Sequence, residues 1–472
     1  MDEPRDDVDI WLSERVKPLL PHPGTFERIR RRARRRKLGQ AAIAAGGAAV
    51  IVAAALTVPP FIDSQLGRGQ TPIANSSTTA TPEHTHSRSP SPPPSSSSPP
   101  SNVTPSGPPP VPPNFAVSSV TFVSLTEGWV LGQAGTPGQC GPPNAFICTS
   151  RAITFNGGTS WQGGHAPVAG LPKGASGVSQ IRALDGRNAW AFGPQLYATH
   201  DTGYTWTPVN TNGMRVIDLE TVHHRAFAVW ARCTGTGADF AANCTGFSLY
   251  STPAGRDQWA PVPGATNLTM SQAAGLAPVP ASAQLALTNT VGYLLAPNGD
   301  VYSGPITTGG AWHLATAQGI PAGCLPGRAQ RDGVPSRAML ATTGTGIVEL
   351  CATTGTGGVQ VKTLRYSADG GRTWQPAGTA PPAGIATSLS GTPDGRVLVA
   401  TTTGIDVSAN TAGSSPSGLS WITVTGASVP GGFSFVGMTS DTQGVAIPAN
   451  KALHAVWFTY DGGKNWVESP VR

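Results

Sequence analysis

The stretch YATHDTGYTW, residues 197–206, places an Asp, a Gly and a Trp at fixed offsets behind a short β-prone run. The same order recurs in LRYSADGGRTW and WFTYDGGKNW and, with Asn in place of Asp, in ITFNGGTSW, and three weaker copies lie between them. Together the copies end in seven tryptophans spaced by roughly 45 to 62 residues: Trp161, Trp206, Trp259, Trp312, Trp374, Trp421 and Trp466. A period of this length is typical of propeller blades rather than of helical repeats.

Each copy predicts a β-hairpin. Gly adopts positive φ without steric strain, and a short Asp side chain accepts hydrogen bonds from turn amides, so the chain can reverse at this point. The Trp that follows can bury a large ring against the neighbouring unit. The residues expected to hold these hairpins are Asn156, Trp161, Asp201, Gly203, Trp206, Asp369, Gly371, Trp374, Asp461, Gly463 and Trp466.

The segments THDTGYTW, SADGGRTW and TYDGGKNW resemble the Asp-box, or BNR repeat, of sialidases and of many propellers without enzymatic activity. LTEGWVLG around Trp129 and LDGRNAWAFG around Trp190 resemble the second strands of propellers such as the photosystem II assembly factors. The resemblance covers about residues 115–472 and implies an all-β, seven-bladed β-propeller with Asp-box hairpins. It implies little about function, because this fold is a scaffold on which many different sites occur.

A membrane anchor is predicted ahead of the propeller. The basic segment RIRRRARRRK at residues 28–37 leads into an uncharged run of 21 residues at 38–58, long enough for one transmembrane helix. A cleavable signal peptide is the alternative, but the long preceding segment and the length of the run favour an uncleaved anchor. Because basic flanks stay in the cytoplasm, we expect a single-pass protein of the cell membrane with a cytoplasmic N-terminus and an extracytoplasmic propeller.

Residues 59–113 consist largely of Ser, Thr and Pro, as in SPPPSSSSPP, and cannot bury a core. They predict a disordered stalk that connects the span to a propeller at residues 114–472. Residues 1–37 hold eleven Lys and Arg against seven Asp and Glu, a net charge of +4, whereas the rest of the chain holds twenty against eighteen, a net of +2. The basic character is therefore local, and we expect no nucleic-acid surface on the propeller.

The six cysteines all lie in the predicted propeller. They form three neighbouring pairs along the chain: Cys140 with Cys148, Cys233 with Cys244, and Cys324 with Cys351. Zinc binding is the alternative to disulfides, but the chain has no Cys-x-x-Cys and no His at ligand spacing near a pair. An even number of cysteines outside the membrane favours disulfides, each closing a loop of one blade, although six cysteines formally allow fifteen connectivities.

The sequence lacks the catalytic pattern that the sialidase resemblance would imply. Those enzymes share an arginine triad, an Arg-Ile-Pro motif ahead of the first Asp-box, and a Tyr nucleophile with a Glu partner. This chain has no Arg-Ile-Pro, and glutamates are scarce in the predicted propeller. We therefore expect a protein that is not an enzyme and needs no metal or cofactor, with a diverged glycoside hydrolase as the alternative.

The segment GRAQRDGVPSR places Arg328, Arg331 and Arg337 between Cys324 and Cys351, and it is the one basic cluster of the predicted propeller. It is either a solvated loop or a surface that binds an acidic glycan or protein. We expect the chain to be a membrane-tethered extracytoplasmic binding or scaffold module for a protein or glycan of a bacterial cell envelope. A one-span signalling receptor, with a cytoplasmic regulator bound to residues 1–37, is a further alternative.

Overall fold

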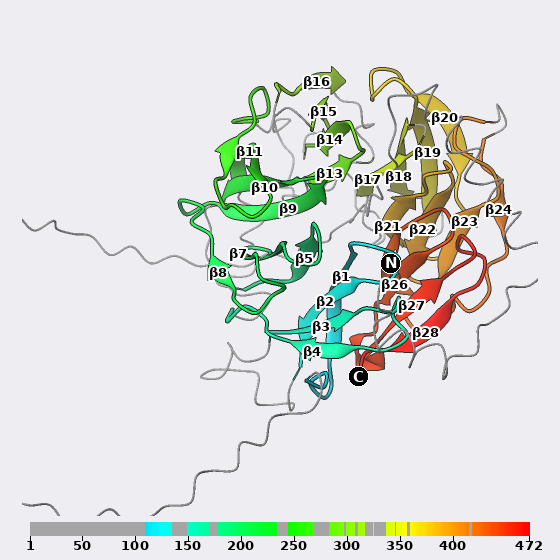
Figure 1. The fold of residues 1–472 in the computed structure, drawn as a ribbon. Coiled ribbons are helices and arrows are strands. Elements are labelled where there is room, and N and C mark those ends of the chain that lie inside the picture. The colour runs from blue at the N-terminus through cyan, green and yellow to red at the C-terminus, as the bar shows by residue number, and fades with distance from the viewer. Residues whose placement is uncertain are drawn as a thin grey trace, which may run out of the picture. The chain divides into compact units, whose positions relative to one another are not determined.

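The computed structural model describes residues 109–134, 149–169, 177–233, 244–268, 283–296, 299–306, 310–316, 324, 337–344, 346–355, 359–414 and 418–472. These residues form seven four-stranded antiparallel sheets, each built from four consecutive strands (Figure 1). The predicted seven-bladed all-β propeller is therefore confirmed. The expected cytoplasmic tail, transmembrane span and most of the stalk lie outside the described residues. Within the described ranges, no helix combines the length and apolarity needed to cross a bilayer.

The seven sheets are numbered here as blades 1 to 7 in chain order. Blades 1 and 2 contain β1 (Ala116–Phe122), β2 (Gly128–Gln133), β3 (Thr149–Thr154), β4 (Gln162–Gly164), β5 (Gln180–Ala183), β6 (Ala189–Phe192), β7 (Leu196–Thr199) and β8 (Thr207–Pro208). Blades 3 and 4 contain β9 (Arg215–Val222), β10 (Arg225–Cys233), β11 (Cys244–Pro253), β12 (Ala260–Pro261), β13 (Gln284–Leu287), β14 (Val291–Leu295), β15 (Val301–Pro305) and β16 (His313–Thr316). Blade 5 contains β17 (Arg337–Thr343), β18 (Gly346–Thr354), β19 (Gln360–Ser367) and β20 (Gln375–Thr379), and blade 6 contains β21 (Ala386–Gly391), β22 (Val397–Thr401), β23 (Ile405–Ser408) and β24 (Trp421–Ile422). Blade 7 contains β25 (Phe433–Met438), β26 (Gly444–Pro448), the 3₁₀ helix η5 (Lys451–Leu453), β27 (Ala455–Thr459) and β28 (Val467–Pro470).

The blades surround a common axis. In Figure 1 the first strands of the blades lie nearest the centre and the fourth strands lie at the periphery. Each first strand contacts the first strand of the next blade, and β1 contacts β26 and β27 of blade 7, so the ring closes. No strand is shared between the first and last blades, since each sheet consists of four consecutive strands.

The hydrophobic core lies between the blades. Seven clusters of buried apolar side chains occur, one at each junction of neighbouring blades. At the junction of blades 2 and 3, for example, Trp190 of β6 packs with Val216 of β9 and Trp230 of β10. Because neighbouring blades cover both faces of each sheet, inner strands such as β6 (AWAF) are buried along their whole length.

The fold begins earlier than the expected boundary at residue 114. Val111, which the composition assigns to the stalk, is buried in the cluster between blades 1 and 7. The carbonyl oxygen of Pro109 accepts a hydrogen bond from the Gly163 amide of β4 (2.8 Å). A proline-rich segment can therefore end in packed structure where it carries an apolar residue beside the open edge of a fourth strand.

Candidate functional site

The repeated Asp-Gly-Trp segments form hairpins between the third and fourth strands of their blades, here called the outer hairpins. In blade 2 the Thr199 hydroxyl donates to Asp201 Oδ1 and accepts from the Gly203 amide, both at 2.9 Å. Asp201 also accepts from the Thr205 amide (2.9 Å) and the Thr205 hydroxyl (2.6 Å). The same network recurs at Thr154, Asn156, Gly158 and Ser160, at Ser367, Asp369, Gly371 and Thr373, and at Thr459, Asp461, Gly463 and Asn465.

These hydrogen bonds commit the carboxylates to their turns. The hydroxyl and amide of Thr205 hold the pKa of Asp201 at about 2, and those of Thr373 do the same for Asp369. At neutral pH both groups are charged acceptors and have no proton to donate. Their geometry therefore supports hairpin formation rather than acid or base catalysis.

The seven repeat tryptophans all contact the preceding blade, with blade 7 preceding blade 1. Five contacts are hydrogen bonds: Trp161 Nε1 to Ser469 Oγ, Trp206 Nε1 to His165 O, Trp312 N to Pro263 O, Trp421 Nε1 to Thr379 O and Trp466 N to Thr425 O. Trp259 packs edge-on against Trp190 of blade 2, and Trp374 packs on the cluster that includes Tyr293 of blade 4. The tryptophans thus connect successive blades around the ring.

The hairpin ahead of Trp421 contains a residue that the repeat motif does not single out. Its longer turn suggests a disturbed register, yet Trp421 pairs with Ser408 of β23. Asn410 Oδ1 accepts from the Ser420 amide (2.8 Å), so it takes the part that Asp201 takes in blade 2. The Ser-x-Asn spacing of Ser408 and Asn410 is the sequence signal that could have identified it.

The connections differ between the two ends of the strands. The four longest connections are at residues 134–148, 165–179, 262–283 and 317–336. All four join a second strand to a third strand, or a fourth strand to the next blade, and therefore leave the ring at the end opposite the outer hairpins. We call this end the long-connection face.

Both described disulfides also involve connections of the long-connection face. Cys233 is bonded to Cys244 across the connection from β10 to β11, with Cα atoms 3.9 Å apart. Cys324, between β16 and β17, is bonded to Cys351 of β18, with Cα atoms 5.1 Å apart. These two predicted pairings are confirmed, whereas Cys140 and Cys148 lie outside the described residues.

The predicted arginine site is divided by the structure. Arg328 and Arg331 lie outside the described residues, and Arg337 is the first residue of β17 rather than part of an exposed loop. The Arg337 guanidinium donates through Nη1 to the Thr387 carbonyl of blade 6 (3.0 Å), and burial lowers its pKa to about 10. Sequence spacing could not show this, because the contact depends on how β17 packs against β21.

A polar cluster, here called the axial cluster, contains Ser119 of β1, Arg182 of β5 and Glu220 of β9. Gln180, two residues before Arg182, lies on the same face of β5 and is counted with it. Arg182 Nε donates to Glu220 Oε1 (2.9 Å), and Arg182 Nη1 reaches Ser119 Oγ (3.4 Å). A side chain of blade 2 that contacts blades 1 and 3 on their first strands must lie near the axis. Arg182 is only 2% exposed there.

The axial cluster holds hydrogen-bonding atoms without partners in the described part of the chain. Both amide atoms of Gln180 and Nη2 of Arg182 are buried and unpaired. Leaving such a group unpaired costs about 1–3 kcal/mol, so it calls for an explanation. Gln180 is the first residue of β5, which places it toward the long-connection face.

Burial also changes the charge of the axial cluster. It raises the pKa of Glu220 to about 8, although the Arg182 charge opposes this shift. Most of the Glu220 population is therefore neutral at pH 7, whereas Asp218, whose pKa burial raises to about 6, is mostly ionised and interacts with the Arg182 charge. Asp218 lies nearby, but its two oxygens accept from the Leu219 and Leu285 amides. The two donors without partners in the described part of the chain, Arg182 Nη2 and the Gln180 amide nitrogen, suit an incoming group with oxygen acceptors.

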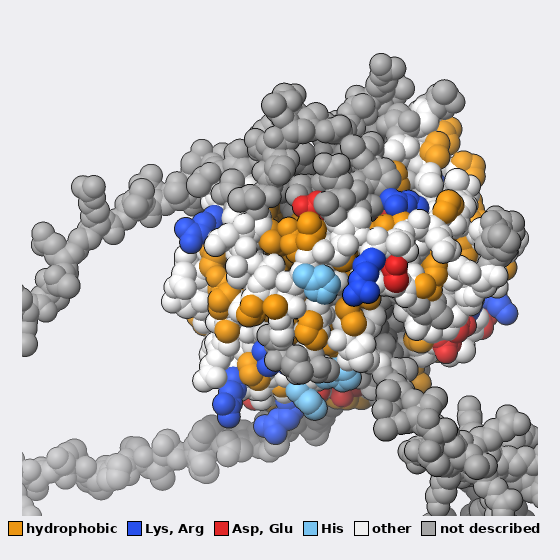
Figure 2. All heavy atoms as spheres, turned by 90° about the horizontal axis from the view of Figure 1, so that it is seen from above, with side chains coloured by type: hydrophobic (Ala, Val, Ile, Leu, Met, Phe, Trp, Pro, Cys, Tyr) orange, Lys and Arg blue, Asp and Glu red, His pale blue; other side chains and the backbone are white. Residues whose placement is uncertain are grey.

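Other features of the described residues give no indication of catalysis or metal binding. No group of three or more His, Cys, Asp or Glu side chains within these ranges could hold a metal ion. Figure 2 shows the edge of the domain that lies uppermost in Figure 1. Among the described residues visible there, Lys and Arg side chains lie singly or in small groups between hydrophobic and uncharged ones.

No protein-family model matches the chain, and no curated protein matches it. Among solved structures it is similar to YCF48 bound to a D1 peptide, with 12% identity, 77% of this chain and 96% of that chain covered, and a TM-score of 0.44. YCF48 from Cyanidioschyzon merolae is 13% identical, with coverages of 76% and 87% and a TM-score of 0.35. The extracellular domain of the putative one component system BT4673 from B. thetaiotaomicron is 11% identical, with coverages of 77% and 39% and a TM-score of 0.41. At this level the similarity concerns the fold alone.

Proposed function

We propose that this chain is a membrane-tethered, extracytoplasmic binding module that does not act as an enzyme, and that it holds an acidic segment of a cell-envelope protein at the long-connection face. The observation that carries the proposal is the axial cluster, where Gln180 and Arg182 have buried donors without partners in the described part of the chain, and Gln180 begins β5 at the end of the strand nearer that face. The strands that the longest connections join end at the same face, where loops of several blades meet in a propeller.

The chemistry of the cluster favours a carboxylate. Arg182 Nη2 and the Gln180 amide nitrogen both donate, and a carboxylate accepts several hydrogen bonds at once. Because both donors are buried, their bonds to a ligand would be little screened by water. An acidic glycan shares the carboxylate and is the competing ligand.

The test compares two glutamines at matched positions. Gln180 and Gln284 each begin the first strand of a blade, but the Gln284 side chain donates to and accepts from Leu340 at 2.8 Å. We expect Q180L to leave the melting temperature unchanged or higher, because it removes unpaired polar atoms. Q284L should lower the melting temperature, because it leaves the Leu340 backbone groups unpaired.

Binding is measured by calorimetry on the full chain with Asp- and Glu-rich peptides, their Asn and Gln counterparts, and a uronic-acid oligosaccharide. The proposal predicts that acidic peptides bind more tightly than the amide counterparts and that Q180L weakens them at least about tenfold. Equal binding of acidic and amide peptides would overturn it. Tighter binding of the oligosaccharide than of the peptides would identify the ligand as a glycan instead of a protein. Release of reducing sugar would establish the glycosidase alternative.

Membrane tethering is tested separately in cells that express the full chain. We expect the protein in the membrane fraction, with the propeller accessible to protease added outside intact cells. A propeller protected from protease would contradict the proposed orientation.

A further inference from the structure

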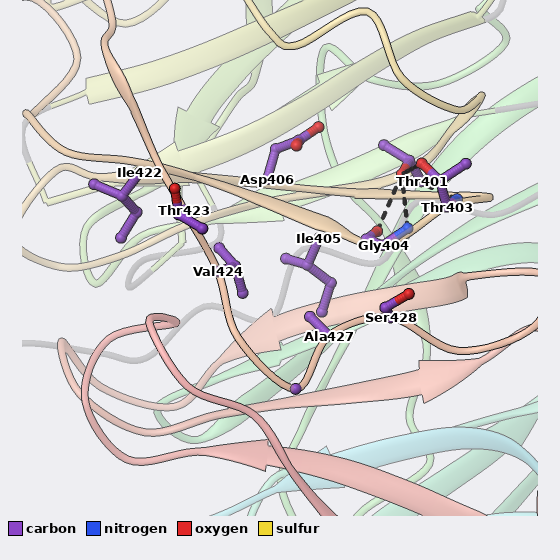
Figure 3. A pocket seen from close by; sticks show the side chains of 11 residues that line it. Thr401, Thr403, Gly404, Ile405, Asp406, Ile422, Thr423, Val424, Ala427 and Ser428 are labelled. Carbon is purple, nitrogen blue, oxygen red and sulfur yellow. Dashed lines mark hydrogen bonds between the residues drawn. The ribbon is translucent and has the colours of Figure 1, made fainter.

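A pocket of about 300 Å³ lies beside β23 in blade 6, away from the axial cluster (Figure 3). It exists because the chain leaves the blade after only a short fourth strand. β24 pairs with Val407 and Ser408 of β23 and goes no further along it. The Thr425 amide then donates to Lys464 O and its carbonyl accepts from the Trp466 amide, both at 2.9 Å in blade 7. The gap left between β23 and the crossing chain is the pocket.

The walls combine aliphatic and polar groups. Figure 3 shows the Ile405 and Asp406 side chains on opposite sides of β23, with Val424 of the crossing chain on the side of Ile405 and the Thr423 hydroxyl pointing to the side of Asp406. The full lining is Thr401, Thr403, Gly404, Ile405, Asp406, Ile422, Thr423, Val424, Gly426, Ala427 and Ser428. Among these residues Asp406 carries the one charge.

The Asp406 carboxylate lacks a hydrogen-bond donor on one oxygen. Its Oδ2 is buried and has no partner among the described residues. The positive charge of Lys362 of β19 acts to lower the pKa of Asp406. The hydrogen bonds of the Lys362 ammonium, however, go to Pro381 O (2.6 Å) and Ala383 O (2.8 Å). Burial raises the pKa of Asp406 to about 6 despite this charge, so the group is mostly ionised at pH 7. The pocket therefore holds an acceptor that no donor of the described fold satisfies.

We propose that this pocket binds the basic side chain of a partner protein, a Lys or Arg whose aliphatic stem enters the gap between β23 and the crossing chain beside Ile405, Ile422 and Val424, and whose charged head donates to Asp406 on the other side of β23. Long basic side chains bury their methylene groups against apolar surface while the head makes polar contacts. A charge-assisted bond to a carboxylate is stronger than one between neutral groups. The pocket volume is at the small end of ligand sites, which suits a single side chain rather than a larger molecule.

This site goes beyond the proposed function, because it lies on another blade and takes the opposite charge. The axial cluster presents donors to an anion, whereas the blade 6 pocket presents an acceptor to a cation. A partner that used both would carry an acidic and a basic group on one surface.

The experiment uses the full chain with methyl-labelled Ile and Val and follows Ile405 and Val424 by NMR. The probes are Nα-acetyl-lysine methylamide and its neutral counterpart, Nα-acetyl-norleucine methylamide. We expect the lysine probe to shift both methyl signals, and D406N to weaken its binding at least about tenfold while leaving the melting temperature unchanged or higher. Asp394, an exposed carboxylate of the same blade paired with Arg396, provides the control variant D394N, which should bind like the parent.

A second variant tests the pocket without changing its charge. V424W fills the gap from the crossing chain and should abolish the shift at Ile405, while the unfolding transition confirms that the ring stays folded. Equal binding of the neutral probe, unchanged binding by D406N, or no shift at the solubility limit of the lysine probe would each overturn the proposal. Tighter binding of free spermidine than of the lysine probe would overturn the protein partner in favour of a small polyamine.

Discussion

Single side chains hold the outer hairpins, and Asp461 of blade 7 provides a test. It accepts from the Asn465 amide (3.0 Å), the Lys464 amide (3.1 Å) and the Thr459 hydroxyl (3.0 Å). We expect D461A to lower the free energy of unfolding by about 1–2 kcal/mol, because these donors lose their acceptor. Urea denaturation measures the change.

Blade 1 supplies the control for this prediction, since Asn156 occupies the corresponding place. Its amide oxygen accepts from the Ser160 amide (2.9 Å), so an amide is compatible with the turn. D461N should therefore lose less than half as much stability as D461A. Equal losses would show that the charge, rather than the acceptor geometry, holds the hairpin.

A buried carboxylate makes stability depend on pH. Glu349 of β18 is fully buried, and burial raises its pKa from 4.5 to about 7 although Arg365 opposes the shift. The native state thus holds a proton that the unfolded state releases, so this residue's contribution to stability falls as pH rises from about 4.5 to 7. The difference corresponds to about 3 kcal/mol.

Replacing the carboxylate by an amide removes this titration. We expect the free energy of unfolding of E349Q, measured by urea denaturation between pH 4 and 8, to vary less with pH than that of the parent. Arg365 is about a quarter exposed and can turn to water when its partner is neutral. Glu468, exposed on β28, gives the matched control E468Q. An unchanged pH profile in E349Q would contradict the prediction.

At the scale of the elements, the junctions between blades depend on close approach of the backbone. Gly264 has φ +78° and lies so near Trp312 that an added Cβ would overlap the Trp312 carbonyl oxygen. Gly213 has φ +77° with nothing within 4 Å of the same position. The two glycines share a left-handed backbone conformation and differ in the space around a Cβ added to each.

Alanine at each position separates the two effects. G213A should lower the free energy of unfolding by about 1 kcal/mol, the penalty of a left-handed conformation for a residue with a Cβ. G264A should lose about 1–3 kcal/mol more, because the blade 3 chain and Trp312 must move apart. Similar losses in thermal unfolding would mean that this junction yields more easily than the contact suggests.

The elements also show what the sequence could predict. Outer hairpins and their tryptophans are local features, so a repeated turn motif was sufficient to predict the seven blades. The segment before Trp421 was recognised as a weaker copy, but the role of Asn410 was not, because extra residues separate Asn410 from Ser420, whose amide donates to it. Spacing alone does not reveal which side chains a turn brings together.

The candidate site could not be predicted in the same way. Arg182 and Glu220 belong to different blades, and their contact depends on where two first strands meet near the axis. Gln180 lies in no recognisable motif, and it stands out only because its buried amide atoms have no hydrogen-bond partners in the described part of the chain. The arginine cluster near Cys324 was a visible pattern, yet the structure places Arg337 against blade 6.

At the scale of the whole molecule, the ring has no shared strand at its closure. Blades 1 and 7 meet through side chains: Phe122 packs edge-on against Phe458, and Gln443 Nε2 donates to Leu125 O (2.8 Å). Val111 and Val471, near the two ends of the domain, lie in the same hydrophobic cluster. The closing junction is thus built like the other six.

Because the seven junctions between blades are built alike, no particular blade has to begin the chain. A permuted chain, in which a short Gly-Ser linker joins Arg472 to Pro109 and new ends are placed at the exposed pair Asn212 and Gly213, should therefore assemble the same ring. Circular dichroism and the melting temperature of this permutant, compared with an unpermuted chain of residues 109–472, measure the outcome. Failure to fold would mean that the order of the blades along the chain matters, whereas success would mean that the ring closes without blade 1 at the start of the chain.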